Sequence, residues 1–191
     1  VGIDIDKINL IKENKIQLCE ELNIPKDAIL ILSVGELNAN KNHKIVIEIL
    51  PELPNNVHYL MCGDGQLKEQ HERLAKKLHV SDRLHFLGYR KDVIKIMKSC
   101  DIFVFPSKRE GLSVALMEAM ACGLPCVVSK IRGNEDLIEN EKGGYCVDLE
   151  NESFNIYINK ILELDLSRSM AAFNYNKVSN YSIKKVNLKM R

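Results

Sequence analysis

The sequence lacks an excess of charge of either sign, because its 191 residues carry 27 lysines and arginines against 26 aspartates and glutamates. Without a basic field to neutralise phosphates, no nucleic-acid partner is expected. No apolar run approaches the ~20 residues that a membrane-spanning helix needs, and no signal peptide opens the chain. The first residue is Val1 rather than Met. We therefore expect the sequence to begin inside a longer protein.

The six cysteines lack the spacing of a disulfide framework or of a zinc site. They are scattered through apolar segments, and the pair Cys122 and Cys126 has no second pair or nearby histidine to complete a metal site. This distribution favours reduced thiols in the core of a cytoplasmic protein. The five histidines form no ligand pair either, and we expect neither a metal nor a cofactor.

What the sequence does contain is a regular alternation of two kinds of segment, without an internal repeat. Short β-rich runs are expected at Ala28–Val34, Val57–Cys62, Arg83–Leu87, Ile102–Phe105, Cys126–Ser129 and Tyr145–Val147. Helical patterns are expected between them at Lys44–Leu50, Leu67–Leu78, Val93–Ser99, Val114–Cys122 and Asn134–Glu139. An amphipathic segment, Lys7–Leu22, precedes the first strand.

Strands that alternate with helices predict an α/β fold. Continuous apolar runs such as Ile29–Leu32 are typical of parallel strands that are buried on both faces. We expect a Rossmann-like, doubly wound parallel sheet of about six strands in residues 1–150 and a C-terminal helical extension in residues 151–191. The basic end, from Lys184 to Arg191, is expected to be a solvated or partner-facing helix. With the strand order 3-2-1-4-5-6, a ligand crevice opens where strands one and four end, at Gly35 and Phe105.

The residues directly after the fourth strand suit an anion. A polar loop with Arg109, Glu110 and Gly111 leads into a helix predicted to begin at Val114, with Ser113 as its N-cap. The unpaired N–H groups of the first turn and the helix dipole both favour a phosphate at this point. A glycine in the loop lets a ligand approach the backbone closely.

Glu118 is the one charged residue in the helix Val114–Cys122, which is otherwise apolar on every side. A helix that is apolar all round is typically buried, and a buried carboxylate needs hydrogen-bond partners. The two vicinal hydroxyls of a ribose would supply them. A buried lysine or arginine, or a gap that lets the carboxylate reach solvent, would also satisfy it.

The stretch FPSKREGLSVALMEAMACGLPCVVS, in which Glu110 and Glu118 stand eight residues apart, resembles the E-x7-E signature of the retaining glycosyltransferases of family 4. Similarity extends upstream through SVGELNANKNH, LMCGDGQL and HFLGYRKDV, and downstream through IRGNEDLI and GGYCVD. These enzymes have the GT-B fold of two Rossmann-like domains. The resemblance identifies residues 1–150 as the C-terminal, donor-binding domain of a capsule- or exopolysaccharide-type enzyme, and the N-terminal, acceptor-binding domain has no counterpart in this sequence.

The resemblance implies roles for the residues of the signature. Glu118 would hold the nucleotide ribose, and Glu110 would contact hydroxyls of the donor sugar. The backbone of Gly111, Leu112 and Ser113 would meet the sugar and the diphosphate, where the helix N-terminus already indicates an anion.

The segment after the first strand departs from the family pattern, which has an arginine directly after the glycine, here Gly35, and a lysine five residues beyond it. Lys41 occupies the lysine position and would neutralise the leaving diphosphate, so that Lys41 and Glu110 are the predicted catalytic residues. Glu36 stands where the arginine is expected, and a carboxylate cannot stabilise that developing charge. We interpret Glu36 as a feature of the capsule- or exopolysaccharide-type branch, with Arg109 or Lys108 as a supplementary cation.

The loop that begins Gly88-Tyr89-Arg90 matches the segment that lies along the base in the family. Tyr89 or Arg90 could stack on that base, although Tyr89 is equally compatible with a packing role. The glycine-rich segment 63–65 is interpreted as a tight turn between a strand and a helix, because it lacks the rest of a dinucleotide fingerprint.

The resemblance implies hexosyl transfer from a nucleoside diphosphate sugar, UDP-sugar first and GDP-sugar second, to a glycan or lipid-linked acceptor with retention at the anomeric carbon. It implies a cytoplasmic protein, peripheral at the inner face of the plasma membrane, and a domain that is inactive without its acceptor-binding half. Two other functions stay open: a nucleotide-binding module with no activity of its own, and a GT-B epimerase of the UDP-GlcNAc type.

Overall fold

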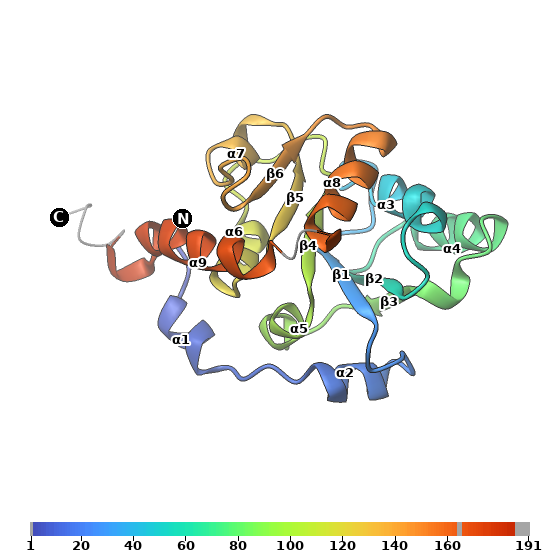
Figure 1. Ribbon diagram of the computed structural model, residues 1–191, viewed down its shortest axis with the longest axis horizontal. Helices are drawn as coiled ribbons and strands as arrows, with labels where there is room; N and C mark the ends of the chain where they lie inside the picture. Colours follow the sequence, from blue (N-terminus) through green and yellow to red (C-terminus); the bar gives the residue numbers. More distant parts are fainter. Residues whose placement is uncertain (1, 164–165, 186–191) are drawn as a thin grey trace.

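A single parallel sheet organises the computed structural model, which describes residues 2–163 and 166–185. The strand order in this part of the chain is β3-β2-β1-β4-β5-β6 (Figure 1). The strands are β1 (Ile29–Val34), β2 (Val57–Cys62), β3 (Leu84–Gly88), β4 (Ile102–Phe105), β5 (Cys126–Ser129) and β6 (Gly144–Val147). Both the predicted fold class and the predicted strand order are confirmed. From β1 the chain adds strands first on one side of the sheet, as β2 and β3, and then on the other side, as β4, β5 and β6.

Each face of the sheet has its own hydrophobic core, because successive side chains of a strand point to opposite faces. In β1, Leu30 and Leu32 enter one core and Ile31 enters the other. The first core is covered by α1 (Ile5–Leu10), α2 (Lys15–Glu21), α5 (Val93–Ser99) and α6 (Val114–Ala121). The second is covered by α3 (Lys44–Ile49), α4 (Lys68–Lys77) and α8 (Asn151–Glu163). Burial on both faces explains the continuous apolar runs of the strands.

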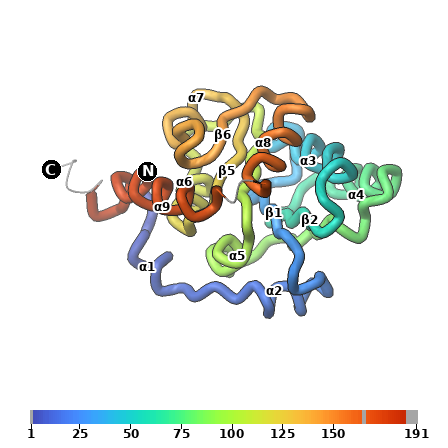
Figure 2. The backbone as a smooth tube through the Cα atoms, viewed as in Figure 1, coloured from blue at the N-terminus to red at the C-terminus, as the bar shows by residue number. Residues whose placement is uncertain are grey.

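The C-terminal helices pack against the sheet domain. Helix α8 contacts α3, and α9 (Ser167–Val178) contacts α6. The Ile3 N–H donates to the Tyr181 carbonyl, and the Ile183 N–H donates to the Ile3 carbonyl, each at a distance of 3.0 Å. The start of the chain therefore lies beside its C-terminal part (Figure 2). Of the basic end, residues 186–191 lie outside the described residues.

One predicted helix differs from the structure, and the amphipathic segment before β1 forms two helices rather than one continuous element. The segment Lys7–Leu22 is divided between α1 and α2, because Asn14 begins a new helix by accepting the Gln17 N–H at 2.9 Å. The helix predicted at Asn134–Glu139 is the four-residue α7 (Arg132–Glu135). Helix α7 begins earlier than predicted, and Asn134 lies within its first turn. From there the Asn134 Nδ2 donates to the carbonyl and the hydroxyl of Ser129. Single 3₁₀ turns occupy Leu50–Glu52, Ser81–Arg83 and Ser179–Tyr181.

Candidate functional site

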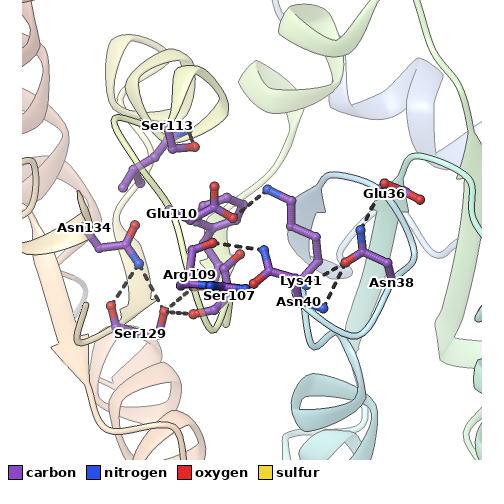
Figure 3. Close-up of polar contacts among 12 residues, drawn as sticks. Glu36, Asn38, Asn40, Lys41, Ser107, Arg109, Glu110, Ser113, Ser129 and Asn134 are labelled. Atoms are coloured by element: carbon purple, nitrogen blue, oxygen red, sulfur yellow. Dashed lines mark hydrogen bonds and ion pairs between the residues drawn. The ribbon is translucent and has the colours of Figure 1, made fainter. Parts of the chain in front are cut away.

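Two loops meet where β1 and β4 end, and an ion pair joins them. The Lys41 Nζ lies 2.6 Å from Glu110 Oε1, and the two side chains are only 20% and 13% exposed (Figure 3). The same ammonium lies 4.7 Å from the centre of the Phe105 ring. Its stem passes over Gly35, where a Cβ would lie 3.0 Å from the lysine Cε. The structure thus brings together the two residues that were predicted to be catalytic.

Asparagine side chains shape the first loop and attach it to the second. The Asn38 Oδ1 accepts the backbone N–H groups of Asn40 and Lys41, each at 3.0 Å, and the Asn38 Nδ2 donates to Glu36 Oε2 at 3.0 Å. The Asn40 Nδ2 donates to the Arg109 carbonyl at 2.9 Å, across the gap between the loops (Figure 3). Glu36 itself is exposed.

The N-terminus of α6 opens beside this pair. Ser113 caps the helix as predicted, since its hydroxyl accepts the Leu116 N–H at 3.3 Å. A Cβ added to Gly111 would meet no atom within 4 Å, and Leu112 is 37% exposed. The backbone before the helix therefore borders open space, where its N–H groups and the helix dipole favour an anion. The Arg109 side chain is exposed at the same loop.

A buried polar cluster supports the Glu110 loop from below. The Ser129 hydroxyl donates to the Ser107 carbonyl at 2.5 Å, and the Asn134 Nδ2 donates to the Ser129 carbonyl at 2.9 Å. Gly133 faces the loop so closely that a Cβ there would lie 2.2 Å from the Gly111 carbonyl oxygen. Backbone therefore packs directly on backbone at this point, which only glycine permits.

Glu118 is half-buried, and its side of α6 is less covered than the apolar sequence predicts, because Val114, one turn earlier, is 43% exposed. Burial raises the pKa of the Glu118 carboxyl above its usual value. Within residues 2–163 and 166–185, no hydrogen bond or ion pair reaches its side chain. The alternative that a buried lysine or arginine pairs with Glu118 is therefore not met in this part of the chain. A half-buried acceptor without a protein partner suits a hydroxyl-bearing ligand.

A pocket of about 390 Å³ lies at the carboxyl ends of β1, β2 and β3. It is lined by Val34, Gly35, Glu36, Cys62, Gly63, Asp64, Tyr89, Arg90 and Val93. Tyr89 is 84% exposed and projects at its rim. The Arg90 guanidinium is held by Glu21 at 2.5 Å and by Asp92 at 2.8 Å, and the hydrogen bond that Arg90 donates to Asp92 contributes most to raising the pKa of Arg90. Of the two residues predicted to stack on the base, Tyr89 is therefore the one whose side chain is free to do so, because the Arg90 guanidinium is held in ion pairs.

The turn at 63–65 is shaped by packing. Its first N–H donates to the Gly88 carbonyl at 2.8 Å. A Cβ on Gly63 would lie 2.0 Å from the Gly35 carbonyl oxygen, and one on Gly65 would lie 2.6 Å from that of Leu37. These approaches explain both glycines without a phosphate, in agreement with the interpretation of the segment as a tight turn.

His43 is a core residue although it follows Lys41 closely. It is 1% exposed, its Nδ1 lies 3.0 Å from the Tyr59 hydroxyl, and burial lowers its pKa to about 3. In the part of the chain that the structure describes, no cluster of three or more His, Cys, Asp or Glu side chains could hold a metal ion. No helix in that part is both long and apolar enough to cross a membrane.

Several residues of the site escaped the sequence analysis. Asn38 and Asn40 look like ordinary loop residues, although two asparagines just before a lysine are typical of a structured turn. Gly133 and Ser129 are recognisable only from the tertiary contact with the Glu110 loop. Phe105 was assigned to a strand, and its contact with the Lys41 ammonium depends on how that side chain folds back.

Comparison with known proteins agrees with this geometry. A curated relative from Escherichia coli, UDP-Gal:alpha-D-GlcNAc-diphosphoundecaprenol alpha-1,3-galactosyltransferase, is 32% identical over 171 residues, which span 85% of this chain and 43% of the relative. The Lipopolysaccharide core biosynthesis glycosyltransferase LpsE of Rhizobium meliloti is 30% identical over 74% of the chain and 42% of its own length. The chain thus spans less than half the length of these relatives.

Solved structures show the same fold. Anabaena Alr3699/HepE in complex with UDP-glucose superposes with a TM-score of 0.89 and 25% identity, over 99% of this chain and 54% of that one. The C-terminal domain of a Glycosyl Transferase Group 1 Family Protein from Francisella tularensis superposes with a TM-score of 0.83 and 20% identity, over 95% of this chain and the whole of that one. The family model "Glycosyl transferases group 1" matches residues 14–178. The chain therefore belongs to the group 1 glycosyltransferase family.

Proposed function

We propose that this chain is the donor-binding half of a glycosyltransferase and holds a UDP-sugar in the crevice between the β1 and β4 loops. The observation that carries the proposal is the Lys41–Glu110 pair beside the open N-terminus of α6. Support comes from the UDP and UDP-glucose bound to the Anabaena structures and from the UDP-Gal in the name of the Escherichia coli relative. A GDP-sugar is the second candidate donor.

Each part of the donor has a chemical counterpart in the crevice. The 390 Å³ pocket, with the exposed ring of Tyr89 at its rim, suits the base. The Glu118 carboxylate suits the ribose hydroxyls, since it has no other partner in the described residues. The diphosphate would lie between Lys41 and the N-terminus of α6, with Arg109 as a further cation. Glu110 would then accept hydroxyls of the sugar.

The reaction that these groups support is sugar transfer with retention. The bond from the anomeric carbon to the diphosphate breaks, and a bond to the acceptor oxygen forms on the same face of the sugar. The acceptor proton passes to the departing phosphate oxygen. Lys41 and the α6 N–H groups would stabilise the charge on that leaving group, so the protein contributes positioning and electrostatics.

The acceptor side of the reaction belongs to a second domain in this proposal. Residues 1–150 would form the donor domain, residues 151–191 its helical extension, and an N-terminal domain outside this sequence would bind a glycan or lipid-linked acceptor. The diphosphoundecaprenol in the name of the Escherichia coli relative supports work at the cytoplasmic face of the membrane. The chain by itself is expected to bind the donor and to transfer nothing.

Calorimetric titration of the chain with UDP, GDP and ADP tests the proposal. UDP should bind more tightly than the other two, and Glu118→Ala should weaken it about tenfold or more, equivalent to about 1.4 kcal/mol, by removing the ribose contact. Glu72→Ala is the matched control, because Glu72 is a half-buried glutamate in α4 on the opposite face of the sheet. The proposal is wrong if none of the nucleotides binds, or if the two variants bind UDP equally well.

A further inference from the structure

The two loops that carry Lys41 and Glu110 pass beyond the backbone pairing of the sheet. The ladder between β1 and β4 pairs Ile31 with Ile102 and Leu32 with Phe103. The loops that follow have no strand pairing to keep them at a constant separation. Their relative position must therefore come from side chains and from single backbone hydrogen bonds.

Asn40 supplies two of these hydrogen bonds. Its carbonyl accepts the Lys108 N–H at 2.8 Å, and its Nδ2 donates to the Arg109 carbonyl at 2.9 Å. One residue of the β1 loop thus holds two consecutive residues of the β4 loop, directly before Glu110. The neighbouring Lys41 is consequently placed opposite Glu110 by contacts within the chain itself (Figure 3).

Asn38 and Glu36 fix the conformation from which Asn40 acts. Backbone N–H groups only donate and a carboxylate only accepts, so the Asn38 amide has one orientation that satisfies all three of its partners: its oxygen towards Asn40 and Lys41, and its nitrogen towards Glu36. An arginine at position 36 could not accept from that amide. The carboxylate that departs from the family pattern therefore has a partner inside the loop.

We propose that Glu36, Asn38 and Asn40 form a clasp that holds the Lys41 loop on the Glu110 loop, and that these three are positioning residues for the donor diphosphate. The clasp itself follows from the contacts above, and its effect on a diphosphate rests on the function proposed in the preceding section. Glu36 acts on the diphosphate through Asn38 rather than through direct contact with the phosphates. In this chain no cation stands at position 36, and the residue there instead helps to fix the loop that carries Lys41.

Amide hydrogen exchange measured by NMR on the unliganded chain tests the clasp directly. Asn40→Ala removes the side-chain bond, and Asn40→Asp keeps the shape while facing the Arg109 carbonyl with a second acceptor. Both should speed exchange of the Lys108 amide about tenfold or more, because its acceptor is no longer held. Asn151→Ala is the matched control, since the Asn151 amide also donates to a single partner, Glu48 at 3.1 Å, outside the crevice. Lys108 exchange within about twofold of wild type in both Asn40 variants would overturn the clasp.

Two variants of Glu36 separate the effect of its hydrogen bond with Asn38 from the effect of its negative charge. Glu36→Gln keeps an acceptor for the Asn38 amide and should leave exchange of the Lys41 amide near that of the wild type. Glu36→Ala removes the acceptor and should speed it. Equal exchange in the two variants would exclude Glu36 from the clasp.

Titration with UDP and with uridine, which has no phosphate, tests positioning. Asn40→Ala should weaken UDP by about fivefold or more and leave uridine unchanged, because the clasp acts on the group that meets the phosphates. Equal weakening of both ligands would mean a general loss of structure and would overturn the positioning role. If the wild-type chain bound no UDP at all, the proposed function would fail, while the exchange data would still decide whether the clasp exists.

Discussion

We expect the ion pair between Lys41 and Glu110 to oppose binding of a nucleotide that lacks a sugar. The two groups pair with each other at 2.6 Å and have little exposure to solvent. A diphosphate that draws Lys41 away leaves the carboxylate poorly solvated and without a cation, which is costly. A complete UDP-sugar would offset that cost, because its hydroxyls can donate to the carboxylate.

Glu110→Gln should therefore raise the affinity for UDP by about threefold to tenfold, since Lys41 is no longer held by a charge. The affinity for UDP-glucose should not rise, because the sugar loses its best acceptor. Calorimetric titration of both ligands measures the two effects. Asp101→Asn is the control: it makes the same charge change in the Lys15–Asp101 pair, also 2.6 Å long, just before β4 and away from the crevice. Weaker UDP binding in Glu110→Gln would show that Glu110 contacts the nucleotide itself.

Single residues also show how far sequence reasoning reaches. Lys41 and Glu110 were recognisable because both belong to a known pattern, and they meet across 69 positions as the predicted topology requires. Glu118 was recognisable from physics as a charge in an apolar helix. Asn38, Asn40 and Gly133 were not, because their importance lies in backbone groups that they contact far away or around a turn, and no composition or periodicity records those contacts.

At the scale of an element, α7 is the clearest support for the site. A Cβ on Gly133 would lie 2.2 Å from the Gly111 carbonyl oxygen and 2.6 Å from that of Glu110. Gly133→Ala should lower the free energy of unfolding by about 1–3 kcal/mol, because backbone atoms cannot move aside as a flexible side chain can. It should also weaken UDP binding by displacing the Glu110 loop. Chemical denaturation and titration measure the two losses.

Gly111→Ala is the comparison for Gly133→Ala, because the two glycines lie on opposite sides of the same backbone contact. A Cβ there meets nothing within 4 Å, so the unfolding free energy should stay within about 0.5 kcal/mol of wild type. The added methyl would instead enter the space where the donor is proposed to lie, and UDP-glucose should bind more weakly. Equal stability of the two alanine variants would contradict the close packing of α7 on the loop.

Elements were predictable in proportion to their length and burial. The strands were recognisable because their runs are short and rich in apolar residues, and β2, β4 and β5 are buried along their whole length. The short α7 was misplaced, because a four-residue helix owes its position to the Asn134–Ser129 contacts rather than to an apolar period. The division between α1 and α2 depends in the same way on Asn14, whose backbone N–H donates to the Ser99 hydroxyl at 3.1 Å.

For the molecule as a whole, we expect buried histidines to contribute to the loss of stability in acid. Burial lowers the pKa values of His43, to about 3, and His85, to about 4, and it also lowers those of His58 and His71. His58 Nδ1 and His85 Nε2 lie 3.0 Å apart in stacked rings, so that charging both at once is unfavourable. His43 contacts Tyr59 in the second core, the one covered by α3, α4 and α8.

These shifts predict a stability loss between pH 6.5 and about pH 4. A histidine whose pKa is lower in the folded state binds its proton more readily when unfolded, so its contribution is complete above pH 6.5 and falls as the pH drops. Each such group costs at most about 1.4 kcal/mol per pH unit in that interval. Urea denaturation at successive pH values should show the slope, and His85→Gln should reduce it. His79→Asn is the control, because His79 is exposed and has a φ of 56°, a backbone conformation that asparagine tolerates. An unchanged slope in His85→Gln would mean that protonation of the stacked pair His58 and His85 does not destabilise the fold. The loss of stability in acid would then come from His43 and His71.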